Sequence, residues 1–287
     1  MNNELIDLQE YTPTGEGGTA ITYKHNSRNS LAKFYNPGFE ADAARDEFLT
    51  ARAVYDMGVP TPEPIRLVTD GQRNGAEYEF IPGKRSFARI LSEQPEREEE
   101  IARAFAQAGR ALHSTHADTS RLPSVKDILR SFYAEHAEVV TPEYRQRALA
   151  FIDKAPEGDT CLHGDFHIGN IITDGKRTLW IDVGQFNYGV PEWDLGWFWT
   201  ISHNLGEERA HSLLHMSQSA LISFWNAFLP AYLGTTDAGT LEAYTLRSLS
   251  FYAARVPYMF YLNHSHSRIP EQGLQALLRL LSSRLTR

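Results

Sequence analysis

The sequence contains a single cysteine, Cys161, among its 287 residues. One thiol cannot form an intramolecular disulfide, which fits a protein of the reducing cytoplasm. No run approaches the roughly 18 apolar residues that a membrane-spanning helix needs, and the first residues lack the basic and apolar segments of a signal peptide. We therefore expect a cytoplasmic protein that does not associate with a membrane.

Positive charge is also in the minority. Lysine and arginine number 28 against 36 aspartate and glutamate residues, a formal net charge of −8, which argues against nucleic acid as the main partner. The chain lacks a G-x-x-x-x-G-K-[ST] element, so a P-loop ATPase has no support. His264-Ser265-His266 has no cysteine or carboxylate within three residues, so we expect a surface loop there and not a metal site.

The order of the predicted elements indicates an α+β protein. Strand-like runs fill much of the first third and helical periodicity dominates the rest, unlike the alternating order of a βαβ protein. Pro82-Gly83 marks the expected boundary between domains of residues 1–81 and 82–287. The expected strands are 5–8, 21–24, 31–35, 66–69 and 77–81, with further strand signals in 161–184. The expected helices are 41–57, 98–116, 126–138, 142–154, 207–229, 238–256 and 270–286.

The segment from Cys161 to Asp194 carries the clearest chemistry. It places Asp165 five residues before Asn170 and seventeen before Asp182. Phosphoryl transfer needs one carboxylate to orient an attacking hydroxyl and oxygen ligands to hold Mg²⁺ on the nucleotide phosphates. Asp165 suits the first role, and Asn170 and Asp182 suit the second. A polar turn, with a turn or helix-capping aspartate at position 182, is the alternative.

Two elements near the N-terminus fit the same chemistry. Lys33 lies in the apolar run 31–35 and Glu47 lies on the next predicted helix; such an ion pair positions an ammonium group against the α and β phosphates. A lysine that points from a strand into solvent is the alternative. In Gly15-Glu16-Gly17-Gly18-Thr19, the backbone N–H groups of Gly15, Gly17, Gly18 and Thr19 could close over phosphates. A glycine-rich hairpin turn would have the same sequence.

Together these residues resemble the aminoglycoside phosphotransferase and choline kinase-like family, relatives of protein kinases that phosphorylate small molecules. The resemblance covers nearly the whole chain. The family carries an H-G-D-x-x-x-x-N loop, an I-D-x-[GD] segment and a D-P-x-x-D-like element. The matching residues are His163-Gly164-Asp165 with Asn170, Ile181-Asp182-Val183-Gly184, and Pro191-Glu192-Trp193-Asp194.

The resemblance implies a two-lobed, protein-kinase-like fold. A small antiparallel-sheet N-lobe, residues 1–81, would bind the nucleotide, and a larger, mainly helical C-lobe, residues 82–287, would carry the catalytic loop. The implied roles are Asp165 as the catalytic base, Asn170 and Asp182 as Mg²⁺ ligands, Lys33 and Glu47 as the phosphate-positioning pair, Glu79-Phe80-Ile81 (with Glu79 and Ile81 at its ends) as the hinge that holds the adenine, and Asp194 as a brace for the catalytic loop.

We therefore expect a phosphotransferase that uses ATP and Mg²⁺ and acts on a hydroxyl of a small molecule. Aminoglycosides, amino alcohols and sugars all remain open as acceptors. Residues 195–287 hold five acids and seven bases, so this region is no obvious trap for a polycation, and its aromatic side chains could bind a quaternary ammonium group or simply fill the core.

Two other interpretations are weighed against this one. A protein kinase is disfavoured because residues 184–194 leave little room for a long activation loop and no Ala-Pro-Glu follows. A non-catalytic nucleotide-binding or regulatory protein is disfavoured because every expected catalytic position is filled.

Overall fold

The structure is a computed structural model that describes residues 3–16, 20–36, 42–263 and 271–282. The chain divides into two compact units. The first comprises Met1–Phe87 and Gly169–Phe186, and the second comprises Ala88–Ile168 and Asn187–Arg287. The expected division into functional lobes of residues 1–81 and 82–287 stays a prediction, because compactness alone does not say which residues bind the nucleotide.

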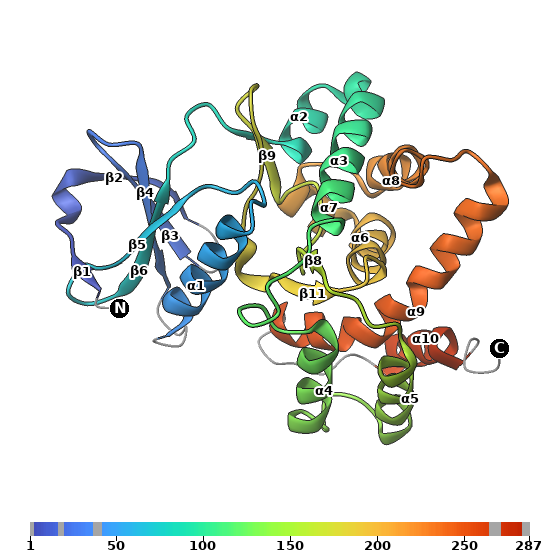
Figure 1. Cartoon of the computed structure of the whole chain (residues 1–287). Coiled ribbons are helices and arrows are strands. Elements are labelled where there is room, and N and C mark those ends of the chain that lie inside the picture. The colour runs from blue at the N-terminus through green and yellow to red at the C-terminus, as the bar shows by residue number, and fades with distance from the viewer. Residues whose placement is uncertain (1–2, 17–19, 37–41, 264–270, 283–287) are drawn as a thin grey trace. The chain divides into compact units, whose positions relative to one another are not determined.

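The first unit contains a largely antiparallel sheet in the order β1-β5-β6-β4-β3-β2 (Figure 1). Only the short β1 pairs in parallel, with β5. A second sheet has the order β10-β9-β7. The strands are β1 Glu4–Leu5, β2 Tyr11–Glu16, β3 Ala20–His25, β4 Ser30–Tyr35, β5 Pro64–Thr69, β6 Asn74–Glu79, β7 Arg85–Ser86, β9 Ile171–Thr173 and β10 Thr178–Trp180. The helices are η1 Leu8–Glu10, α1 Ala43–Asp56 and the turn η3 Val183–Gln185.

Helix α1 lies against this sheet because one of its faces is apolar. Phe48 is buried in a cluster with Leu67 of β5 and Ala76 of β6. Next to them, Gly75 lies opposite Phe34 in the register of β4 and β6, and a Cβ atom at Gly75 would stand 2.5 Å from the Lys33 carbonyl oxygen. Position 75 therefore needs glycine, and the close approach keeps β4, which carries Lys33, in register with β6.

The second unit is mainly helical, with one two-stranded sheet of β8 and β11. Its elements are α2 Phe87–Glu93 (whose first residue belongs to the first unit), η2 Pro95–Arg97, α3 Glu98–His113, α4 Val125–Glu135, α5 Pro142–Lys154, β8 Thr160–Leu162, β11 Asn187–Gly189, α6 Glu192–Asn204, α7 Glu207–Leu214, α8 Gln218–Leu233, α9 Ala238–Asn263 and α10 Glu271–Ser282. A sheet-rich N-terminal part and a helical C-terminal part confirm the α+β class. Among the described residues, no helix combines the length and the apolar composition needed to cross a membrane.

Several predicted elements differ from those observed. The helix expected over 207–229 is two helices, because His215 adopts a left-handed conformation with φ of 57° and ends α7. The strand expected over 5–8 is limited to Glu4–Leu5, since Leu8 begins a 3₁₀ turn that Asp7 caps. The helix α2 and the strand β2 had not been expected. His264 and His266 lie outside the described residues.

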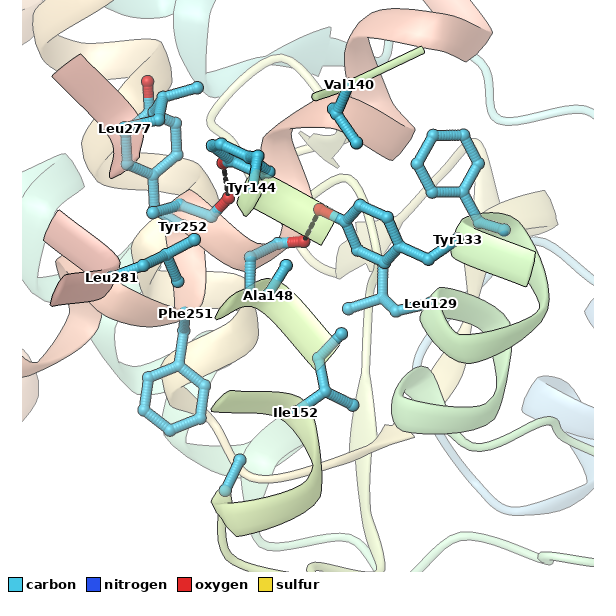
Figure 2. Close-up of a cluster of buried hydrophobic side chains, with 14 of the residues drawn as sticks. Leu129, Tyr133, Val140, Tyr144, Ala148, Ile152, Phe251, Tyr252, Leu277 and Leu281 are labelled. Atoms are coloured by element: carbon cyan, nitrogen blue, oxygen red, sulfur yellow. Dashed lines mark hydrogen bonds between the residues drawn. The ribbon is translucent and has the colours of Figure 1, made fainter. Parts of the chain in front are cut away.

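A cluster of buried side chains from α4, α5, α9 and α10 forms the core of the second unit (Figure 2). Pro257 lies inside α9 and has no N–H to give to the carbonyl of Ala253, four residues earlier. The Tyr144 hydroxyl of α5 donates to that carbonyl instead (Figure 2). The Tyr133 hydroxyl of α4 donates to the neighbouring Ala254 carbonyl at 2.8 Å. The core thus repairs the break that proline makes in the helix.

Tyr144→Phe tests this repair. We expect it to lower the free energy of unfolding by about 1–3 kcal/mol, because a buried carbonyl then has no donor. Tyr133→Phe is the matched control: Ala254 keeps the helical N–H of Tyr258, so the loss should be about 0.5–1.5 kcal/mol. Urea denaturation followed by circular dichroism measures both. Equal losses in the two variants would contradict the account.

Candidate functional site

The first unit contains a cavity of about 390 Å³. Its walls come from β3, β4, α1, the chain before β5, the end of β6 and the residues around β9 and β10. Six residues predicted for the site line it: Lys33, Glu47, Glu79, Ile81, Asn170 and Asp182. Segments more than a hundred residues apart in the sequence therefore meet at one cavity.

Lys33 lies between two carboxylates in this cavity. Its Nζ atom donates to both oxygens of Glu47 at 2.9 Å and lies 3.5 Å from Oδ1 of Asp182. Burial alone would lower the pKa of Lys33, but the two carboxylates outweigh burial and raise it. The ammonium group therefore keeps its charge at neutral pH and stands beside the acidic group of Asp182.

Glu47 is held on several sides. Besides Lys33, the hydroxyl of Tyr35 donates to it, and Gly184 lies so close that a Cβ atom there would stand 3.3 Å from Cγ of Glu47. Burial raises the pKa of Glu47, while Lys33 opposes that rise. Since two side chains of β4 bond the carboxylate, it can hold the lysine in one position.

Asn170 and Asp182 reach the cavity through a hairpin. They flank β9 and β10, and the N–H of Ile181 donates to the Asn170 carbonyl at 2.9 Å. Asp182 has φ of 58° and ψ of 51°, a left-handed conformation that aspartate tolerates better than most residues and that often occurs at functional sites. The nearby Gly184 does not have a positive φ. The strained residue is the acid itself.

The donor set suits a hard divalent cation. An amide oxygen and a carboxylate are ligands that Mg²⁺ accepts when nucleotide phosphates and water supply the rest. Within the described residues, no group of three or more histidine, cysteine, aspartate or glutamate side chains could hold a metal ion. Asn170 and Asp182 supply two oxygen ligands, so water or a bound ligand would have to supply the others.

The segment from Glu79 to Ile81 borders the cavity with its backbone. The N–H of Glu79 donates to the Glu63 carbonyl at 2.8 Å, and the N–H of Phe80 donates to the Asn29 carbonyl at 3.0 Å. For the N–H of Ile81 no acceptor occurs among the described residues. The buried Ile81 therefore presents a backbone donor that a ligand could use.

The glycine-rich segment is only partly described. Gly15 lies in β2 and pairs with Thr22 of β3, where the register shifts by a bulge. Gly17, Gly18 and Thr19 lie outside the described residues. The predicted phosphate contact of this segment stays a prediction.

Lys84 is a residue of the cavity that the motif analysis did not include. Its side chain is exposed at the cavity, but nearby protein atoms displace part of the water around the ammonium group and lower its pKa, and no carboxylate pairs with it among the described residues. It follows the Pro82-Gly83 turn, in a stretch where a lone lysine ordinarily faces solvent. Only the folded structure places this second cation at the cavity.

The second unit holds the loop segment of His163, Gly164 and Asp165 through a fully buried acid. The carboxylate of Asp194 accepts the N–H of His163 at 2.7 Å and the N–H of Gly164 at 3.0 Å. Gly164 has φ of 81°, a conformation that favours glycine. Nδ1 of His163 accepts the N–H of Asp165 at 3.2 Å, which requires that nitrogen to be unprotonated.

Asp194 in turn depends on two cationic or polar partners. Nε2 of His113 lies 3.2 Å from it, and Nη1 of Arg255 lies 3.7 Å from it. A second guanidinium nitrogen of Arg255 donates to the Gly164 carbonyl. Sequence analysis missed both residues, although Arg255 interrupts an apolar stretch of α9 and a charged side chain in such a stretch is a signal.

Asp165 has a partner at each carboxylate oxygen. Nε1 of Trp197 donates to Oδ1 at 2.7 Å, and Nε2 of His167 lies 3.4 Å from Oδ2. Burial would raise the pKa of Asp165, but the two histidines of the loop and the Trp197 indole outweigh burial and hold the pKa well below its usual range. The carboxylate is therefore ionised at neutral pH and able to accept a proton only transiently.

The structure thus brings Lys33, Glu47, Asn170 and Asp182 together in the first unit, and it places Asp165 in the second. In the aromatic stretch of α6, Trp193 and Phe198 lie in the core, whereas the indole of Trp197 contacts Asp165.

Comparison with known proteins agrees with the motifs. Residues 11–228 match the model of the phosphotransferase enzyme family. No curated protein matches the sequence. The chain is similar in fold to a choline/ethanolamine kinase family protein from Mesorhizobium loti, with 14% identity, a TM-score of 0.55, and coverage of 96% of this chain and 88% of that one.

Two aminoglycoside phosphotransferases share the fold as well. APH(2″)-Ib in its ADP-bound form is 18% identical with a TM-score of 0.56, over 96% of this chain and 92% of that chain. A thermostable mutant of APH(4)-Ia in its apo form is 14% identical with a TM-score of 0.60, over 96% of this chain and 95% of that chain. The fold is therefore protein-kinase-like, as the motifs implied. Since the family model spans most of the sequence and the fold agrees with it, this chain belongs to the phosphotransferase enzyme family, the aminoglycoside phosphotransferase and choline kinase-like enzymes.

Proposed function

We propose that this protein transfers the γ-phosphoryl group of ATP to a hydroxyl of a small molecule, with Asp165 as the base. The observation that carries the proposal is the cavity in which Lys33 and Glu47 form an ion pair beside Asn170 and Asp182. A nucleoside triphosphate with its cation requires an ammonium group near its phosphates and oxygen ligands for the cation.

The adenine and the phosphates have separate sets of groups. The N–H of Ile81 offers a donor to the adenine, and apolar side chains such as Leu31 line the same cavity. Lys33 and Lys84 offer positive charge to the phosphates. Asn170 and Asp182 would hold Mg²⁺, which supplies further charge neutralisation on the phosphates when it is bound.

In the proposed reaction, the acceptor hydroxyl oxygen forms a bond to the γ-phosphorus while the bond from phosphorus to the bridging oxygen breaks. ADP leaves with that oxygen, and the hydroxyl proton passes to the Asp165 carboxylate. The low pKa of Asp165 suits late proton transfer, because the acceptor oxygen becomes acidic only as its bond to phosphorus forms.

The spacing of the proposed base and metal ligand also occurs in a relative. Two structures of APH(4)-Ia carry alanine in place of an aspartate and of an asparagine that lie five positions apart, each in a ternary complex with a nucleotide and hygromycin B. Asp165 and Asn170 are likewise five positions apart. The acceptor classes that remain are aminoglycosides, amino alcohols and sugars.

The single cysteine cannot form an intramolecular disulfide, which supports a cytoplasmic location. Its thiol is also a poor candidate for a nucleophile. Cys161 is buried and forms no disulfide, and burial raises the pKa of its thiol to about 11. The thiol is therefore protonated at neutral pH and a poor nucleophile, so a covalent phosphoryl-cysteine route has no support.

Two substitutions separate the roles of the acids. Asp165→Asn should leave ATP binding within about twofold of wild type and lower turnover by about 10²–10⁴-fold, since it removes the base alone. Asp182→Asn should abolish the dependence of ATP affinity on Mg²⁺ and abolish turnover. Calorimetric titration with ATP, with and without Mg²⁺, and release of ADP measure both effects. Wild-type turnover by Asp165→Asn would show that Asp165 is not the base.

Lys84→Met tests the second cation. We expect KM for ATP to rise about 5–15-fold with little change in kcat, the loss expected for one charge-assisted contact of about 1–1.5 kcal/mol. Lys176→Met, at a lysine of the same unit that does not line the cavity, is the matched control and should leave KM unchanged. If Lys84→Met weakens the binding of adenosine as much as the binding of ATP, Lys84 does not contact the phosphates.

A panel of small hydroxyl compounds identifies the acceptor. Release of ADP from MgATP should rise with one class among aminoglycosides, choline or ethanolamine, homoserine, methylthioribose and other sugars, and Asp165→Asn should lose that rise. ATP binding without stimulation by any compound would favour a non-catalytic nucleotide-binding or regulatory protein.

A further inference from the structure

Trp197 contacts Asp165 from the helix that also holds the loop. Asp194 and Trp197 lie three residues apart on α6, so they lie on neighbouring positions of one helical face. Asp194 accepts the N–H groups of His163 and Gly164, and Trp197 donates to the next residue, Asp165. One turn of helix therefore fixes both the backbone and the carboxylate of the loop.

Burial alone does not explain why the indole N–H of Trp197 forms a hydrogen bond. Trp193, one turn earlier on α6, is fully buried, and its Nε1 has no hydrogen-bond partner among the described residues. Trp197 is only half-buried, yet its Nε1 lies 2.7 Å from Oδ1 of Asp165. That distance is typical of a short, charge-assisted bond to a carboxylate.

The two oxygens of Asp165 are held unequally. The contact of Oδ2 with Nε2 of His167 is 3.4 Å, longer than the 2.7 Å between Oδ1 and Trp197. The other charged or titratable groups that face Asp165 are His163 on the same loop and, from α9, Arg255. Oδ2 is therefore the oxygen that an incoming hydroxyl can engage at lower cost.

We propose that Trp197 is a positioning residue of the phosphotransfer reaction. Its indole N–H holds Oδ1 of Asp165, so that Oδ2 takes the proton of the acceptor hydroxyl. At the same time the hydroxyl oxygen forms its bond to the γ-phosphorus and ADP leaves. This inference rests on the proposed role of Asp165 as the base. The indole also lowers the pKa of Asp165, which helps to keep the carboxylate ionised.

The first measurement detects the hydrogen bond without any turnover. The chain has five tryptophans, so ¹⁵N-labelled protein should give five indole N–H resonances, and the one missing from Trp197→Phe belongs to Trp197. We expect that resonance to be downfield, to exchange slowly with solvent and to move in Asp165→Asn. An indole proton that exchanges as fast as an exposed one and ignores Asp165→Asn would overturn the inference.

The second measurement is kinetic and uses MgATP with the acceptor that stimulates ADP release, or basal MgATP hydrolysis if none does. Trp197→Phe keeps an aromatic ring but loses the donor, and we expect kcat to fall about 10–100-fold with KM for ATP within twofold. Trp197→His restores a ring donor and should recover part of the rate. Trp199→Phe is the matched control on the same helix, since Trp199 stacks on His203, and it should stay within twofold of wild type.

Asp165→Asn in the same assay separates the two proposals. If Asp165→Asn is inactive and Trp197→Phe turns over at the wild-type rate, the inference about Trp197 fails and the proposed function stands. If Asp165→Asn turns over at the wild-type rate, the role of Asp165 fails, and the inference that depends on it fails as well. A fall in kcat for Trp197→Phe that Trp197→His does not relieve would assign Trp197 a packing role only.

Discussion

The site depends most on one fully buried carboxylate. Asp194 has no exposure to solvent, and a charge in that position is stable only if hydrogen bonds and cations replace water. Two backbone N–H groups of the loop, His113 and Arg255 do so. Because the acid needs these partners, the loop that carries Asp165 can adopt only the conformation that supplies them.

A comparable constraint operates at the cavity of the first unit. Lys33 keeps its charge because two carboxylates outweigh its burial, and Glu47 stays in place because Lys33 and Tyr35 both bond it. Asp182 adopts a left-handed backbone conformation that costs energy in most contexts. In each unit, holding an acid in a defined position therefore costs folding free energy, as expected where charge must be presented to a substrate.

Part of the fold and of the candidate site could be predicted from the sequence, because it depends on local sequence pattern. The spacing of Asp165, Asn170 and Asp182 and the periodicity of α1 required no knowledge of tertiary contacts. The partners of Asp194 could not be predicted, since His113 lies 81 residues before it and α9 follows it by more than forty residues. The contact of Trp197 could not be predicted either, because an aromatic helical stretch is usually buried and only tertiary packing brings this indole to an acid.

The most direct test of the account is the destination of the phosphoryl group. With γ-³²P-labelled ATP, Mg²⁺ and the acceptor panel, we predict that label appears in a small-molecule phosphate ester and that Asp165→Asn prevents its appearance. Label that appears only on protein would indicate a protein kinase. Label that remains in ATP, although ATP binds in the cavity, would contradict a small-molecule phosphotransferase.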